Sequence, residues 1–258
     1  MTNEHAVRTI LAAGTATATA QANAAAVVEA FDTLKTYDWG ADPETLKPID
    51  EAILATHGDP AARAVLEKRL LDALAGGISR SAQDYVCRRL RTVGTARSVE
   101  PLAALLAVEE TSHIARYALE RIPDEKAIEA IRDALPKVSA KLKPGLIGSL
   151  GVRRDTKSIR ALAKLLGDSN VQVARAAAQS LGLIGTPAAT GELAKFAGKA
   201  PAHMKMPVAD ARLVCAERLL ADGEKSQATA LYKELTGDDQ PAHVKVAAIK
   251  GLVAASRK

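Results

Sequence analysis

Histidine and cysteine side chains build many catalytic and metal sites, and this chain has only five histidines and two cysteines. Cys87 and Cys215 lie 128 positions apart, without a second cysteine or a histidine at the short spacing of a metal site. Both fall on apolar helical faces, where a free thiol packs as a small hydrophobe. None of the five histidines is followed by glutamate: His5, His57, His113, His203 and His243. We therefore predict no metal ion and no cofactor.

The patterns of nucleophilic and phosphate-binding sites are also missing. No G-x-S-x-G occurs, and no histidine is recognisably paired with a cysteine or a carboxylate. The stretch "GSLGVRR" has two glycines near basic residues, but it ends a helix and does not follow a strand. The sequence thus names no catalytic residue. We expect a non-catalytic protein, and an enzymatic role stays open as a third alternative that a pocket with a carboxylate or histidine of perturbed pKa would favour.

Charge is unevenly distributed along the 258 residues, whose formal net charge is +5. Residues 1–50 carry seven acids against three bases, and residues 141–199 carry ten bases against three acids. Such a polarity can steer an acidic partner, and it can equally be a solvated face. The basic segment therefore leaves nucleic-acid binding open as the alternative function, through a basic patch of Lys143, Arg153, Arg154 and Arg160.

Similar helices recur along the chain at intervals of 29 to 38 residues. Each has an anchor leucine with an apolar residue four positions before it, and in four of six cases another three positions after it. This spacing predicts one buried stripe on each helix. The anchors are Leu90, Leu119, Leu150, Leu181, Leu219 and Leu252.

A second amphipathic segment stands between successive anchors, and short turns such as "VGT", "IGTP" and "ADGE" join the two. Glycine can end a helix with a positive φ, and threonine or aspartate can cap the next helix. A helical pair of about 30 residues cannot bury its apolar stripe alone, so neighbouring pairs stack. We predict an all-α fold, a right-handed α-solenoid of roughly six HEAT-like helical pairs.

The N-terminal part is less regular, and we expect residues 1–78 to form a divergent helical cap with a low-complexity start. In it Tyr37 and Trp39 would be the large apolar contacts. Residues 79–258 would form the repeat array, continuous with the cap in a single domain. Ile10–Ala24 ends in a small-x-small sequence that is typical of signal cleavage, but Glu4 lies where a basic leader would be. We expect a cytoplasmic protein, with export as the alternative if residues 1–24 are a weak signal segment.

The stretch "VARAAAQSLGLIGTPAATGELAKF" resembles the bacterial HEAT-like repeats of the phycocyanobilin-lyase type. Residues 170–197 match that pattern best, and residues 81–256 match it as a degenerate array. The motifs "TYDWG", "YVCRRL", "SLGVRRD" and "CAERLLADG" also make the chain similar to uncharacterised HEAT-repeat proteins of planctomycete type. The resemblance implies the fold and not an activity, because proteins with such repeats include lyases, glycosylases, hydroxylases and scaffolds.

Three enzyme classes with related repeats fit this sequence poorly. Deoxyhypusine hydroxylases hold two irons with His-Glu pairs, which are missing here. HEAT-like DNA glycosylases need tryptophans around an exposed base, and the single tryptophan, Trp39, lies outside the regular repeats. For a bilin lyase nothing supports the assignment beyond the shared repeat.

The remaining candidate is the exposed stripe of the anchor helices. Residues two and six positions before each anchor fall between the buried positions. In HEAT solenoids these helices line the concave surface, so the resemblance implies a continuous polar surface that binds another protein. Its residues would be Asp84, Arg88, His113, Tyr117, Arg175 and Gln179. Solvated charges are the alternative for this set. Arg153 replaces an apolar residue of the repeat and could bind a carboxylate within its turn.

Overall fold

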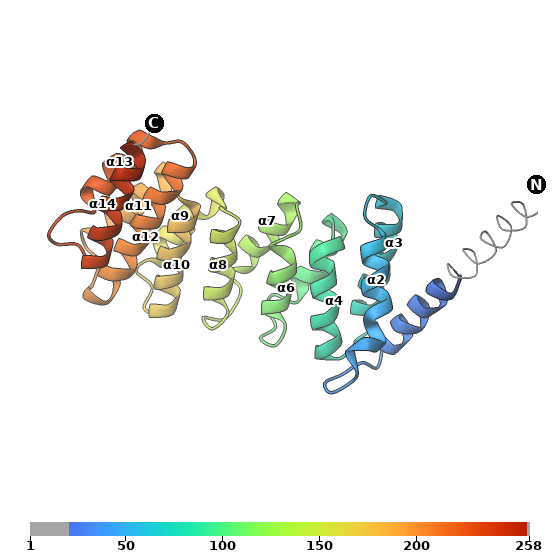
Figure 1. Cartoon of the computed structure of the whole chain (residues 1–258). Coiled ribbons are helices and arrows are strands. Elements are labelled where there is room, and N and C mark those ends of the chain that lie inside the picture. The colour runs from blue at the N-terminus through green and yellow to red at the C-terminus, as the bar shows by residue number, and fades with distance from the viewer. Residues whose placement is uncertain (1–20, 257–258) are drawn as a thin grey trace, which may run out of the picture. The chain divides into compact units, whose positions relative to one another are not determined.

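The computed structural model describes residues 21–256, and within this range the chain consists of helices and turns without a strand (Figure 1). The predicted all-α fold class is confirmed. The signal-like segment Ile10–Ala24 lies largely outside the described residues. The described chain divides into two compact units, residues 21–102 and 103–256. No described helix is long and apolar enough to cross a membrane.

The first unit begins with a helix at residues 21–34. Further helices follow, of which α5 runs across the boundary between the units: η1 (Pro43–Leu46), α2 (Lys47–Ala55), α3 (Pro60–Ala75), α4 (Arg80–Val93), η2 (Ala96–Ser98) and α5 (Val99–Ala104). Side-chain caps begin several of these helices, as when Asp59 accepts hydrogen bonds from the first amides of α3. The core of this unit is built from Phe31, Leu34, Leu46, Ile49 and Leu70.

Trp39 corrects the sequence-based picture of the first unit. Its side chain is 93% exposed, so it is not a core contact of the cap. It lies in the turn before η1, where Gly40 has a φ of +86°. Tyr37 fits the prediction better, because it is half-buried and its ring lies 6.4 Å from that of Tyr85.

The second unit continues with helices that alternate between two layers. One layer holds the second helix of each pair: α6 (Ser112–Leu119), α8 (Lys143–Val152), α10 (Val171–Ile184), α12 (Ala202–Ala221) and α14 (Ala242–Ser256). The other holds the first helices: α7 (Glu125–Ala134), α9 (Ile159–Leu165, preceded by η3, Thr156–Ser158), α11 (Pro187–Ala197) and α13 (Lys225–Glu234). Each second helix packs on the next, from α6 to α14, and α9 packs on α11 (Figure 1).

The predicted buried stripe is confirmed on the second helices. The anchors from Leu90 to Leu219 are buried, and only Leu252, on α14, is partly exposed. The apolar residues four positions earlier are all fully buried, from Val86 to Ala248. Burial of such side chains is the main favourable contribution to the stability of the array.

Glycine and alanine let successive second helices touch through their main chains. A Cβ at Gly151 would lie 2.8 Å from the Cα of Ser180, and a Cβ at Gly182 would lie 2.8 Å from the carbonyl oxygen of Ala211. The buried Ser180 hydroxyl donates a 2.7 Å hydrogen bond to the Ile147 carbonyl. These contacts fix α8, α10 and α12 against one another.

Replacing Gly182 with alanine tests this close approach. We expect Gly182→Ala to lower the free energy of unfolding by about 1–3 kcal/mol, because the added methyl group meets main-chain atoms that cannot move aside easily. The matched control is Gly191→Ala, since a Cβ at Gly191 in α11 meets nothing within 4 Å. There we expect a gain of about 0.5–1 kcal/mol from helix propensity. Urea unfolding measures both, and equal effects of the two substitutions would contradict the packing argument.

Candidate interaction surface

The six residues predicted for a partner-binding surface lie on second helices but are divided between the two units. Asp84 and Arg88 lie on α4 in the first unit, and His113, Tyr117, Arg175 and Gln179 lie on α6 and α10 in the second. Five of the six are exposed and Asp84 is half-buried, so their orientation away from the buried stripe is confirmed. Their continuity as one surface stays a prediction.

In the first unit, Asp84 and Arg88 form an ion pair with 2.7 Å between Oδ2 and Nε. They line a pocket of about 480 Å³ together with Trp39, Tyr37 and Tyr85. The ring of Tyr85 is covered by the guanidinium of Arg89, whose carbon lies 3.5 Å from the ring centroid. Arg89 in turn binds Asp50 through two hydrogen bonds of 2.6 and 2.7 Å. Most charges of this pocket are therefore already paired within the chain.

In the second unit, Arg175 and Gln179 form one wall of a groove between α10 and α12. The groove has a volume of about 600 Å³, and its other wall is provided by Ala202, His203, Met206, Pro207, Asp210, Ala211 and Val214 of α12. Met206 is 56% exposed there. An exposed methionine next to arginine, histidine and carboxylate groups combines an apolar contact with a polar rim, which is the composition of protein-binding sites.

The α12 wall was missed by the sequence analysis, although one signal pointed to it. Pro207 lies inside α12, where it has no amide hydrogen to donate to the carbonyl of His203. A proline in a helix interior costs about 3 kcal/mol of helix stability, so a requirement other than helix propensity must favour proline at this position. Here Pro207 lines the groove beside Asp210, whose carboxylate accepts a 2.6 Å hydrogen bond from Nε2 of His243.

Two residues of the predicted basic patch are engaged within the chain. Arg153 donates hydrogen bonds of 2.7 and 3.1 Å to the carbonyls of Ile122 and Glu120, at the end of α6. The expectation of a carboxylate partner in its turn is therefore wrong, because the unpaired carbonyls at a helix end are nearer acceptors. Lys143 is half-buried and Arg160 is exposed.

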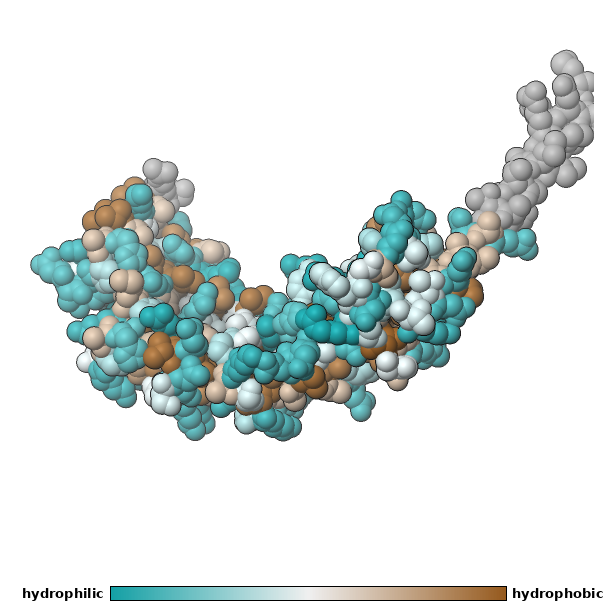
Figure 2. Space-filling model, turned by 90° about the horizontal axis from the view of Figure 1, so that it is seen from below, coloured by the Kyte–Doolittle hydropathy of each residue, from teal (hydrophilic) through white to brown (hydrophobic). Residues whose placement is uncertain are grey.

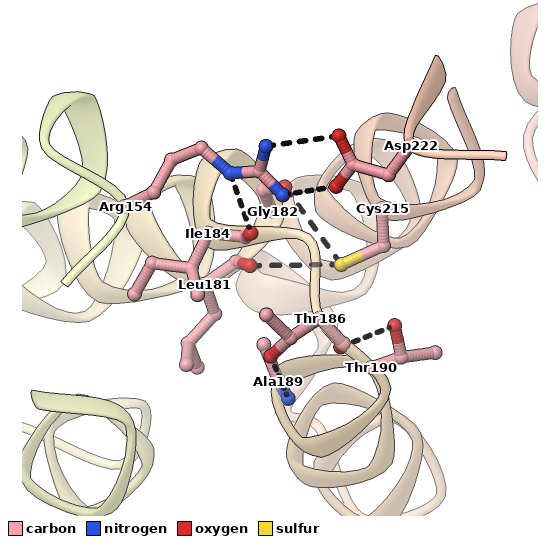
Figure 3. A network of polar contacts seen from close by, with 9 residues as sticks. All are labelled: Arg154, Leu181, Gly182, Ile184, Thr186, Ala189, Thr190, Cys215 and Asp222. Carbon is pink, nitrogen blue, oxygen red and sulfur yellow. Dashed lines mark hydrogen bonds and ion pairs between the residues drawn. The ribbon is translucent and has the colours of Figure 1, made fainter. Parts of the chain in front are cut away.

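The neighbouring residue Arg154, and not Arg153, binds a carboxylate, that of Asp222 (Figure 3). Its Nε donates a 3.1 Å hydrogen bond to the Ile184 carbonyl at the end of α10, and its two terminal nitrogens bind the carboxylate of Asp222 after α12. This pair lowers the pKa of Asp222, through the hydrogen bond and the positive charge of Arg154. One side chain thus connects the ends of three successive second helices.

A second groove, of about 860 Å³, lies in the other layer between α9 and α11. Four of the residues that line it are basic, and one is acidic: Lys157, Arg160, Lys164 and Lys195 against Glu192. Lys157 pairs with Glu125, and Lys195 pairs with Glu192. Arg160 and Lys164 form no ion pair within the described residues, so they carry the open positive charge of this groove.

The cysteines offer no reactive thiol. Both are fully buried, as predicted, and burial raises the pKa of the Cys87 thiol to about 12 and that of the Cys215 thiol to about 11. Cys215 points at the carbonyls of Leu181 and Gly182 (Figure 3), where it packs between α10 and α12. Within residues 21–256 no group of three or more histidine, cysteine and acidic side chains could hold a metal ion.

The turn after α8 also holds a buried carboxylate, Asp155, whose side chain is 5% exposed. Arg132 of α7 binds it through two hydrogen bonds of 2.9 Å, and the Ser158 hydroxyl is a further donor. Burial alone would raise the pKa of Asp155, but the hydrogen bonds from Arg132 and Ser158 and the charge of Arg132 lower it below its usual value.

The lowered pKa makes the stability of the second unit pH-dependent. A carboxyl group with a lower pKa in the folded state stabilises the fold above its unfolded pKa, and this stabilisation is lost as the pH falls through the folded pKa. We expect Asp155→Asn to cost about 2–4 kcal/mol at pH 7, because Arg132 loses its carboxylate. The difference between wild type and variant should begin to shrink as the pH falls below about 4 and should be lost below the lowered, folded-state pKa of Asp155. Urea unfolding at several pH values measures this.

Glu125→Gln is the matched control, since Glu125 forms an exposed ion pair with Lys157. Exposed pairs contribute little, and we expect a change of about 0.5 kcal/mol or less. A constant difference between wild type and Asp155→Asn at every pH would contradict the assignment.

Comparison with known proteins supports the fold and leaves the activity open. A family model of HEAT repeats matches residues 128–211, which run from α7 into α12. No curated protein matches the chain. The crystal structure of an engineered protein is similar at 17% identity with a TM-score of 0.41, over 80% of this chain and 96% of that one. The finer resemblance to lyase-type or planctomycete-type repeats stays a prediction. Residues 128–211 therefore match HEAT repeats, and the described residues have an all-α architecture of stacked helical pairs.

Proposed function

We propose that the protein is a non-catalytic scaffold that binds another protein along the layer of second helices. The observation that carries the proposal is the α10–α12 groove, where exposed Met206 lies on the α12 wall with His203 and Asp210, and Arg175 and Gln179 form the α10 wall. HEAT repeats generally serve as protein-interaction scaffolds, and arginine is enriched among the residues that dominate binding energy.

Rigidity supports this role. The two helices that line the groove meet through main-chain contact at Gly182 and Ala211, so the groove is formed before a partner arrives. A preformed surface loses little conformational entropy on binding, which leaves more of the interaction energy for affinity. The exposed side chains Met206 and Arg175 would then adapt to the partner while their helices stay in place.

The scaffold proposal is tested by crosslinking from inside the groove. A photoreactive amino acid at Gln179 should capture one partner protein from nuclease-treated lysate of the source cells, and the same group at Arg160 in the other layer should not. We expect the double substitution Arg175→Glu and Met206→Ser to weaken capture at least tenfold, a loss of about 1.4 kcal/mol or more. Both side chains are exposed, so the fold should be unaffected.

The control variant is Lys157→Ala, which removes one partner of the exposed Lys157–Glu125 ion pair in the opposite layer. It should capture the partner protein as well as wild type does. Equal capture by the double variant would show that the partner does not use the α10–α12 groove. Capture from position 160 alone would move the binding face to the layer of first helices.

Nucleic-acid binding is the second candidate, and the α9–α11 groove is the observation that favours it. The open charges of Arg160 and Lys164 lie close to Lys157 and Lys195 along one groove. Such a cluster attracts phosphates without reading sequence. The basic patch of this proposal consists of the groove residues and not of Arg153 and Arg154, which are bound within the chain.

The nucleic-acid candidate predicts a steep dependence on salt. Binding of a labelled oligonucleotide, followed by fluorescence anisotropy, should weaken linearly on a logarithmic salt axis as phosphate contacts release counterions. Arg160→Glu with Lys164→Glu should reduce the salt slope by about two contacts. Arg175→Glu, in the other layer, is the charge-matched control and should leave the slope close to that of wild type. No detectable binding at low salt would remove this candidate.

A further inference from the structure

The last described helix, α14, is apolar on both of its faces. Its inner face is buried through Val244 and Ala248, and Gly251 lies against the ring of Tyr232 of α13. Its outer face exposes Val246, Ile249 and Val253 by 53, 54 and 52%, respectively. These three follow one another at the spacing of a single helical stripe.

An exposed apolar stripe of this kind favours association with another surface. Figure 2 shows hydrophobic side chains on the surface at this end of the second unit. Helix α14 contains two lysines and no acidic residue. Lys245 lies near Asp238, whereas the exposed Lys250 forms no ion pair within the described residues.

The first unit carries an apolar groove that could receive a helix. The helix at residues 21–34, α2 and α3 enclose a groove of about 560 Å³ that is lined mainly by alanine and valine. Val65 lines it with 61% of its side chain exposed. Alanine walls let a helix approach closely, as Ala211 does with Gly182 inside the array. Helix-in-groove docking uses apolar anchors at the spacing found on α14.

Charge is complementary as well. The groove has one charged lining residue, Glu51, which is exposed and forms no ion pair within the described residues. Residues 21–59 as a whole carry eight acids and two bases. Pairing of α14 with a second α14 would bring Lys250 near Lys250, and pairing of two grooves would bring together Glu51 and Glu51. Only the pairing of α14 with the groove joins opposite charges.

We propose that the protein self-associates head to tail, with the outer face of α14 docked into the groove between residues 21–34, α2 and α3 of a second copy. The occupant of the groove is thus a helix with an apolar stripe and a flanking lysine, supplied by the neighbouring copy. Such a contact is heterologous: each copy uses two different surfaces and leaves one of each free, so the assembly grows into a ring or a chain.

Sedimentation velocity of the full chain across about two orders of magnitude in concentration tests the assembly. Wild type should rise above the monomer mass of 27.0 kDa as the concentration increases. Ile249→Glu and Val65→Glu should each remain monomeric, and circular dichroism should show unchanged helix content. Val152→Glu on α8 is the matched control, since Val152 is exposed to a similar extent, and it should assemble like wild type.

Mixing Ile249→Glu with Val65→Glu distinguishes head-to-tail docking from other modes of self-association. Each variant keeps one intact surface, so an equimolar mixture should form a dimer and nothing larger. Glu51→Lys and Lys250→Glu should each weaken assembly at least tenfold, and the double variant should recover it. A wild type that stays at 27.0 kDa throughout overturns the proposal. Assembly of Val65→Glu like wild type overturns it too, since α14 would then have another occupant.

Discussion

The structure of the second unit depends on the contact of main chain with main chain between successive second helices. Gly151 lies against Ser180, and Gly182 lies against Ala211, each closer than any side chain would allow. Only 3% of the residues are aromatic, so large rings are not available to fill wide gaps between helices. Close approach of the helix backbones is the alternative way to reach the packing density of a protein interior.

Close approach also determines where function can reside. Because the inner faces are filled by small residues, the larger side chains of α10 and α12 that are not buried extend into the groove between these helices, where Met206 and Arg175 are found. Their spacing is set by backbone packing and not by flexible side chains. Helix α14 packs on α12 and α13 through one face only, and its other face exposes Val246, Ile249 and Val253.

The buried stripe could be predicted from the sequence because it follows from local periodicity. The apolar residues at the anchors and four positions before them repeat with the helix, and burial follows in α8 and α10 as expected. Trp39 could not be placed, because its exposure depends on the turn at Gly40. The partners of Arg154 could not be predicted from the sequence either. Ile184 and Asp222 lie 30 and 68 positions away, and they contact Arg154 only after three helical pairs have stacked.

Arg154 shows why a count of charges misleads in such a fold. It adopts a φ of +50° at the end of α8, a position that Gly185 and Gly223 occupy after α10 and α12. A left-handed conformation costs a non-glycine residue about 1–2 kcal/mol. The hydrogen bonds to Ile184 and Asp222 offset this cost, because charge-assisted bonds are about twice as strong as neutral ones.

Arg153 is bound within the chain as well, so the segment 141–199 has less open charge than its ten basic residues indicate. The basic residues that are not bound within the chain differ between the two layers. Arg160 and Lys164 face the groove between first helices, and Arg175 faces the mixed groove between second helices. The basic layer suits phosphates and the mixed layer suits a protein surface, because an apolar contact such as Met206 adds nothing to phosphate binding. The two candidate functions therefore belong to different faces of one stack, and a change in one face leaves the other intact.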